Sequence, residues 1–187
     1  IVNAGLMDNT MIIFTSSTGM SMGERGLAEK ATPYEEAMKT PLIIYDPRMP
    51  ESKKGTIMTE VTLNIDLAPT IASAAGIKAE DMPEQWQGKD ITQAYLTDND
   101  WGRDDFYFEF LAGNDGASQP TFEGFNIPHK WKYINWDQYD YEQLFDLSSD
   151  LDEAYDLARN PDYEQKLVEL REDMARAKSR MRSGGKV

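Results

Sequence analysis

The sequence predicts an α/β fold, followed by a small α+β subdomain with an antiparallel sheet and a terminal helix. The α/β part rests on two short apolar runs, residues 11–15 (MIIFT) and 42–45 (LIIY), separated by a helix-compatible stretch. The α+β part rests on an aromatic-rich run at 106–110 (FYFEF) and on a periodic apolar stripe near the C-terminus.

The run at 11–15 is continuous and rich in β-branched residues, which is typical of a strand buried on both faces. It ends at the polar residues Ser16, Ser17 and Thr18. Open α/β sheets carry their ligand sites at the carboxyl ends of such strands. The sequence therefore places polar, potentially functional side chains at the edge of a core sheet.

A longer helix is predicted at 67–75 in the first domain, to which we assign residues 1–100. Asp66 can cap this helix by accepting a hydrogen bond from an early backbone N–H, and a site carboxylate is its alternative role. Gly76 suits the left-handed position after the last turn. The remaining elements of this domain are a helix at 34–39, the strand at 42–45 and a short helix at 91–96.

The second domain, residues 101–187, is predicted to contain strands at 106–110, 131–134 and 142–147. Its aromatic residues between 122 and 141 have two interpretations, a wall that stacks on carbohydrate or the core of a small sheet. Asn160 as N-cap and Pro161 at the first helical position open the terminal helix. The apolar stripe of this helix consists of Tyr163, Leu167, Leu170, Met174, Ala177 and Met181.

Composition excludes several classes of function. The net charge of −14 and the pI of about 4.4 argue against nucleic acid or an anionic membrane as partners. The chain has no apolar run long enough to span a bilayer. It has no cysteine, which excludes disulfides, thiolate metal sites and a cysteine nucleophile. The single histidine, His129, has a catalytic role only as the alternative to a structural one.

One long motif lies between residues 8 and 48. It consists of Asp8-Asn9-Thr10, Phe14-Thr15-Ser16, Gly19, Gly23-Glu24, Gly26-Leu27, Lys30, Tyr34-Glu35-Glu36 and Pro41-Leu42-Ile43. These residues match, with the same spacing, the pattern DNT-hydrophobic-FTSD(N/H)G…GEHGL…K…YEE…PLI, so the chain resembles the sulfatase family within the alkaline-phosphatase-like superfamily. The segment EQLFDL at 142–147 resembles the family's Glu-Leu-Tyr-Asp-Leu strand, and residues 148–153 stand where the family has Asp-Pro-x-Glu.

The resemblance implies specific site residues. Ser17 and Thr18 occupy the positions where the family binds calcium through an acidic residue and an Asn or His, and Arg25 replaces a frequent His. Since calcium prefers several oxygen ligands with carboxylates among them, these neutral hydroxyls form either a plain loop cap or a weakened metal site. Lys30 matches the lysine that holds the sulfate ester, and its alternative is a solvated loop lysine.

The resemblance also implies a reaction, hydrolysis of a sulfate ester with an upstream formylglycine and calcium. The Cys- or Ser-x-Pro-Ser-Arg motif that supplies formylglycine does not occur in the sequence. We therefore expect the C-terminal portion of a longer, periplasmic or secreted enzyme, inactive by itself, whose partners are a sulfated small molecule or glycan and the missing N-terminal portion. The alternative is a non-catalytic or degenerate sulfatase-like binding or structural module.

Overall fold

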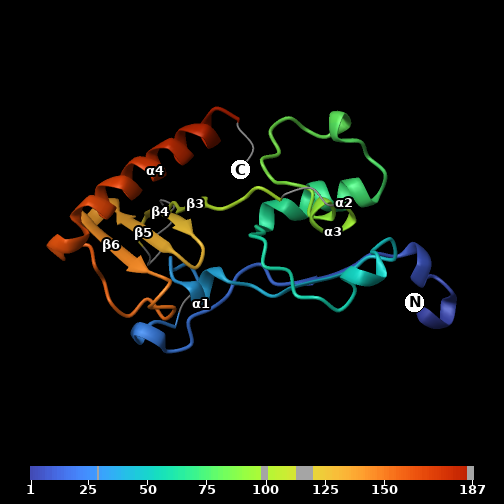
Figure 1. Cartoon of the computed structure of the whole chain (residues 1–187), viewed down its shortest axis with the longest axis horizontal. Helices are drawn as coiled ribbons and strands as arrows, with labels where there is room; N and C mark the ends of the chain where they lie inside the picture. The colour runs from blue at the N-terminus through green and yellow to red at the C-terminus, as the bar shows by residue number, and fades with distance from the viewer. Residues whose placement is uncertain (29, 98–100, 113–119, 185–187) are drawn as a thin grey trace. The chain divides into compact units, whose positions relative to one another are not determined.

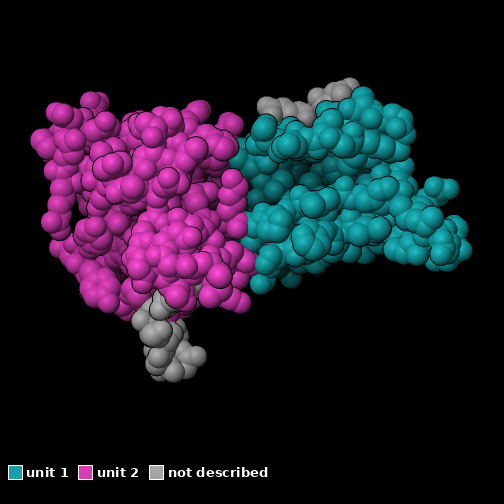
Figure 2. Space-filling model, turned by 90° about the horizontal axis from the view of Figure 1, so that it is seen from below, with its two compact units in different colours: residues 1–17, 40–103, 183–187 teal, residues 18–39, 104–182 magenta. Residues whose placement is uncertain are grey.

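The computed structural model describes residues 1–28, 30–97, 101–112 and 120–184 (Figure 1). The chain divides into two compact units, shown in Figure 2: unit 1 comprises residues 1–17, 40–103 and 183–187, and unit 2 comprises residues 18–39 and 104–182. The domain boundary predicted at residue 100 lies outside the described residues. Unit 2 takes residues 18–39 from the first predicted domain, so Thr18 and Lys30 belong with the C-terminal sheet.

Unit 1 confirms the two strands and the two helices that the sequence predicts for it. Strands β1 and β2 pair antiparallel, with Phe14 opposite Ile43. Gly76 has a φ of 87° after the longer helix, in the left-handed region predicted for it. The elements are β1 (Ile12–Thr15), β2 (Leu42–Tyr45), α2 (Leu67–Ala74) and α3 (Thr92–Leu96).

The prediction that the first strand is buried on both faces is wrong for this chain. The side chains of Phe14 and Ile43 are 61% and 63% exposed, and they lie opposite each other on the same face of the two-stranded sheet. A continuous apolar run encodes a strand that can be covered on both sides, but the covering layer must come from other residues. The described part of unit 1 does not cover this face.

Unit 2 is built around a four-stranded antiparallel sheet in the order β3-β4-β5-β6. Three strands confirm the predicted ones, while β4 was not predicted. The short helix α1 (Glu35–Met38) confirms the helix predicted at 34–39. The strands are β3 (Phe106–Phe110), β4 (Phe122–Ile127), β5 (Trp131–Trp136) and β6 (Tyr141–Asp146).

The terminal helix α4 (Glu164–Arg182) lies along one face of this sheet (Figure 1). Asn160 caps the short 3-10 turn before it, accepting a hydrogen bond from the Asp162 N–H at 3.1 Å, as predicted for the helix start. The predicted stripe is buried against inward-facing sheet residues, which include Tyr107, Phe125, Tyr133 and Leu144.

The opposite face of the sheet is packed by the segment 18–39. Tyr34 joins a second buried cluster with Phe122, Ile134 and Phe145. Neighbouring residues such as Tyr133 and Ile134 thus point to opposite faces, as the alternation of side chains along a strand requires. Both faces bury aromatic residues, which favours the sheet-core interpretation of the aromatic cluster over a carbohydrate-stacking wall.

Candidate functional site

The loop after β1 begins with the two hydroxyl side chains at the predicted metal positions. Ser17 is exposed and belongs to unit 1, whereas Thr18 is half-buried and belongs to unit 2. The Thr18 hydroxyl lies 3.0 Å from the Ala37 carbonyl oxygen and 2.7 Å from that of Gly19. A hydroxyl has one proton to donate to such acceptors. Thr18 therefore fastens the loop to α1.

Gly19 lets this loop pass directly against α1. Its N–H donates to the Ala37 carbonyl at 2.8 Å, and the next N–H, of Met20, donates to the Glu36 carbonyl at 2.9 Å. A Cβ at Gly19 would lie 2.1 Å from the Glu36 carbonyl oxygen. Any other residue would force the two backbones apart, so glycine is required here by close approach.

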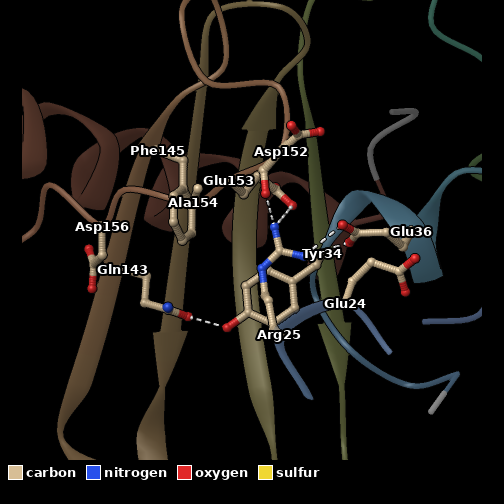
Figure 3. A pocket seen from close by; sticks show the side chains of 10 residues that line it. All are labelled: Glu24, Arg25, Tyr34, Glu36, Gln143, Phe145, Asp152, Glu153, Ala154 and Asp156. Carbon is tan, nitrogen blue, oxygen red and sulfur yellow. Dashed lines mark hydrogen bonds and ion pairs between the residues drawn. The ribbon is translucent and has the colours of Figure 1, made fainter. Parts of the chain in front are cut away.

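Arg25 stands at the tip of a tight turn and anchors it to the body of unit 2. Its backbone is left-handed, with a φ of 54°. Its Nη1 donates to both carboxylate oxygens of Glu36, at 2.7 and 2.8 Å, and its Nη2 donates to the Asp152 carbonyl oxygen. The guanidinium lies 4.2 Å from the centre of the Tyr34 ring (Figure 3). The two terminal nitrogens of the guanidinium thus reach two different partners while its plane lies against Tyr34, which the single ammonium group of a lysine could not reproduce.

Lys30 lies farther along the same segment and is exposed. Its ammonium group makes no hydrogen bond or ion pair with any residue in the described ranges. A cation that is exposed and has no partner among the described residues is available to an anionic ligand. The structure shows no contact between the described side chains of Thr18 and Lys30, so the roles predicted for Ser17, Thr18 and Lys30 stay predictions.

A pocket of about 420 Å³ opens beside Arg25, entirely within unit 2 (Figure 3). Its walls come from the Arg25 turn, from Tyr34 at the start of α1, from β6 and from the loop after β6. Against the single guanidinium stand five carboxylates: Glu24, Glu36, Asp152, Glu153 and Asp156. Because like charges repel, this lining disfavours an anion such as a sulfate ester.

A buried ion cluster lies between α1 and the sheet. The Lys132 side chain on β5 is 0% exposed, and its Nζ lies 2.7 Å from a carboxylate oxygen of Glu35 and 2.5 Å from one of Glu153. Burial alone would raise the pKa of Glu35, but the Lys132 ammonium lowers it overall. Burial raises the pKa of Glu153, and the attraction of Lys132 offsets this only in part.

Sequence reasoning missed Lys132 and assigned no role to Glu153. One signal for Lys132 was available, since it lies two residues before Ile134 and so shares with it the face of β5 that packs against segment 18–39. A lysine on an apolar inward face requires a buried counter-ion. Nothing in the sequence identifies that counter-ion as Glu35 or Glu153.

The structure places Asp66 in a buried ion pair and His129 in an exposed turn. The prediction that the Asp66 side chain caps α2 is wrong: its carboxylate accepts from the backbone N–H groups of Leu63 and Lys89, each at 2.7 Å, and forms a buried ion pair with Arg103. His129 is exposed, with a φ of 60°, in the turn between β4 and β5. The structural alternative for His129 is therefore favoured over the catalytic one.

The described residues contain no group of three or more His, Cys, Asp or Glu side chains arranged to hold a metal ion. The neutral hydroxyls of Ser17 and Thr18 fit calcium poorly, because carboxylates dominate calcium sites and the Thr18 hydroxyl is directed at backbone carbonyls. The described contacts of Thr18 are those of a loop cap, and the weakened calcium site at Ser17 and Thr18 stays a prediction.

Comparison with curated proteins reveals several relatives. The chain is 30% identical over 168 residues to an arylsulfatase of Clostridium perfringens, covering 89% of this chain and 33% of that protein. It is 28% identical over 175 residues to an N-acetylglucosamine-6-O-sulfatase of Bacteroides thetaiotaomicron, covering 89% of this chain and 29% of that protein. The chain thus spans about a third of the length of these relatives.

Solved structures agree with these relatives. A protein in complex with its substrate, D-glucosamine-2-N,6-O-disulfate, superposes with a TM-score of 0.84 at 26% identity, covering 97% of this chain and 36% of that one. A phosphonate monoester hydrolase of Agrobacterium radiobacter superposes with a TM-score of 0.81 at 22% identity, covering 96% of this chain and 37% of that one, which shows a shared fold alone.

The family is established by a match over most of the chain. The sequence profile described as "N-sulphoglucosamine sulphohydrolase, C-terminal" matches residues 23–180. This range contains Lys30, the buried ion cluster and the whole four-stranded sheet. The chain therefore belongs to the sulfatase family and corresponds to a sulfatase C-terminal domain.

Proposed function

We propose that this chain is the C-terminal part of an enzyme that hydrolyses sulfate esters, and that Lys30 contacts the sulfate group. The observation that carries the proposal is the family match over residues 23–180, a range that contains Lys30. The assignment of Lys30 to the sulfate rests on its position in the sequence motif. The exposure of Lys30 supports this role, because its cationic side chain is accessible to the anionic sulfate ester.

A sulfated saccharide is the substrate class that we favour. One relative is named as an N-acetylglucosamine-6-O-sulfatase, and one similar structure holds a disulfated glucosamine as its substrate. The sulfate must lie outside the acidic pocket beside Arg25, where five carboxylates would repel it.

We also propose an extracytoplasmic location. Another relative is named as an extracellular sulfatase homologue of Drosophila melanogaster, at 34% identity over 116 residues. Within the described ranges, none of the helices has the length and apolar character needed to cross a bilayer.

Calcium is expected to bind this chain no more tightly than at about millimolar concentration, the weak end of protein calcium sites. The reason is the loss of carboxylate ligands at Ser17 and Thr18. Isothermal titration calorimetry of the chain with calcium measures this directly. The Ser17→Asp/Thr18→Asn variant should gain affinity if these positions retain the family geometry. A micromolar site in the unmodified chain that Ser17→Ala abolishes would refute the expectation.

The full-length protein should release sulfate from glucosamine 6-sulfate and should act poorly on glucosamine 6-phosphate. This pair of substrates separates a sulfatase from a phosphoester or phosphonate hydrolase of the same fold. Ion chromatography of released sulfate and phosphate, with heat-denatured protein as control, provides the measurement. Faster phosphate release would contradict the proposal.

The second candidate, a non-catalytic sulfatase-like module, is favoured by the neutral residues at Ser17 and Thr18. It predicts that the full-length protein releases no sulfate from a panel of sulfated saccharides and aryl sulfates. It also predicts that the protein still binds a sulfated saccharide. Sulfate release from any member of that panel would exclude it.

A further inference from the structure

We propose that Glu153 is a positioning residue, whose carboxylate holds the segment 18–39, and with it Lys30, on the C-terminal sheet. For its link to sulfate binding the inference rests on the proposed function. Glu153 is the last residue of the segment 148–153, which stands where the family has Asp-Pro-x-Glu. The proposed reaction assigns no role to this segment.

The Glu153 carboxylate contacts three separate elements. One oxygen, Oε2, accepts a hydrogen bond from the backbone N–H of Glu35, the first residue of α1, at 2.9 Å. The same oxygen lies 3.6 Å from Nη2 of Arg25. The other, Oε1, lies 2.5 Å from Nζ of Lys132 on β5. One side chain thus links the turn before Lys30 and the helix after it to the central sheet.

The Glu153 side chain is 0% exposed, so these links operate in a dry environment. A hydrogen bond to a charged acceptor is stronger than one between neutral groups, and burial strengthens it further. The N–H of Glu35 is the first of α1, and N–H groups at a helix start lack partners within the helix. Glu153 therefore supplies the acceptor that this N–H requires.

The backbone at Glu153 supports a role for its side chain. Its φ of 50° lies in the left-handed region, which disfavours residues with a Cβ and favours glycine or asparagine. The neighbouring Asp150 stabilises this turn, accepting from the N–H groups of Ala154 and Tyr155 at 3.0 and 2.9 Å. The preceding carbonyl, of Asp152, also accepts from Arg25.

Glu153→Gln is a mild substitution because both neighbouring cations keep another counter-ion. Lys132 retains Glu35 as a counter-ion at 2.7 Å, and Arg25 retains its ion pair with Glu36, also at 2.7 Å. Glu153→Gln therefore leaves no cation in the cluster without an anion. What it removes is the negative charge that attracts the α1 N–H and the two cations together.

The test is amide hydrogen exchange of the chain, followed by mass spectrometry. In Glu153→Gln, peptides from segment 18–39 should exchange about ten-fold faster, the effect of weakening one charged hydrogen bond. In Glu153→Ala the increase should be larger. Peptides from α4 and from β4 to β6 should keep their protection from exchange in Glu153→Gln. If Glu153→Ala does not fold, the comparison of Glu153→Gln with wild type alone decides the test.

Glu142→Ala is the matched control. Glu142 lies on the same sheet and pairs with Arg171 of α4, but within the described residues it makes no hydrogen bond or ion pair with segment 18–39. This variant should leave the exchange of segment 18–39 unchanged. Unchanged exchange in both Glu153 variants, or a uniform increase across unit 2, would overturn the positioning role.

A second readout connects positioning to sulfate. In the full-length protein, Glu153→Gln should lower kcat/KM for a sulfate ester about ten-fold, while Glu142→Ala should leave it within about two-fold. Equal values for Glu153→Gln and wild type would overturn the link to Lys30. If the wild-type protein releases no sulfate, the proposed function fails, and the exchange measurement still decides whether Glu153 holds the segment.

Discussion

Lys132→Met is expected to lower the free energy of unfolding by about 3–5 kcal/mol, the usual cost of removing one partner from a buried ion pair. The variant preserves most of the side-chain volume but deletes the ammonium group between Glu35 and Glu153. Among the described residues, the buried Glu153 carboxylate would then keep one cation, the more distant Arg25 at 3.6 Å. Urea unfolding at neutral pH measures the loss.

The loss should depend on pH with a defined sign. Burial already raises the pKa of Glu153 in the folded protein, and without Lys132 it would rise further. A folded state with the higher carboxyl pKa binds the proton more tightly than the unfolded state, so lowering the pH stabilises it. The loss of unfolding free energy in Lys132→Met should therefore be largest above the pKa of Glu153 in the folded protein. It should shrink as the pH falls toward 4.5, the ordinary pKa of a glutamate.

A partly exposed lysine provides the control for this prediction. Lys166→Met breaks an i,i+3 pair with Glu169 and removes the ammonium that lies 5.5 Å from the centre of the Trp131 ring, so it should cost at most about 1 kcal/mol. Equal urea midpoints for Lys132→Met and Lys166→Met would show that the ion cluster is not buried in solution.

Local patterns in the sequence were sufficient to predict most of the fold. Apolar runs and the stripe of α4 predicted β1, β2, β3, β5, β6 and the terminal helix. Strand β4 was not predicted from the sequence, because FEGFNI contains Gly124 and Asn126, which are uncommon in strands. A Cβ at Gly124 would lie 2.3 Å from the Phe108 ring, and Asn126 donates to Glu35 at 3.2 Å. Both residues are therefore explained by tertiary contacts.

The candidate site was predictable only in part, for the same reason. The motif identified Lys30 and the altered positions Ser17 and Thr18 by register alone. The contacts that hold this segment join residues about a hundred positions apart, such as Lys132 with Glu35, separated by 97 positions, and Glu153 with Glu35, by 118. No local pattern encodes such pairs. Nor does a local pattern reveal whether a strand is covered, which is why the predicted burial of Phe14 was wrong.

The most direct test of the account is the kinetics of sulfate release by the full-length protein carrying Lys30→Ala. Removing a group that stabilises developing charge costs about 10²–10³-fold in kcat. Lys39→Ala is the matched control, since Lys39 is also an exposed lysine of segment 18–39. The account predicts a loss of that size in Lys30→Ala and a change within about two-fold in Lys39→Ala. Wild-type kinetics in Lys30→Ala would contradict it.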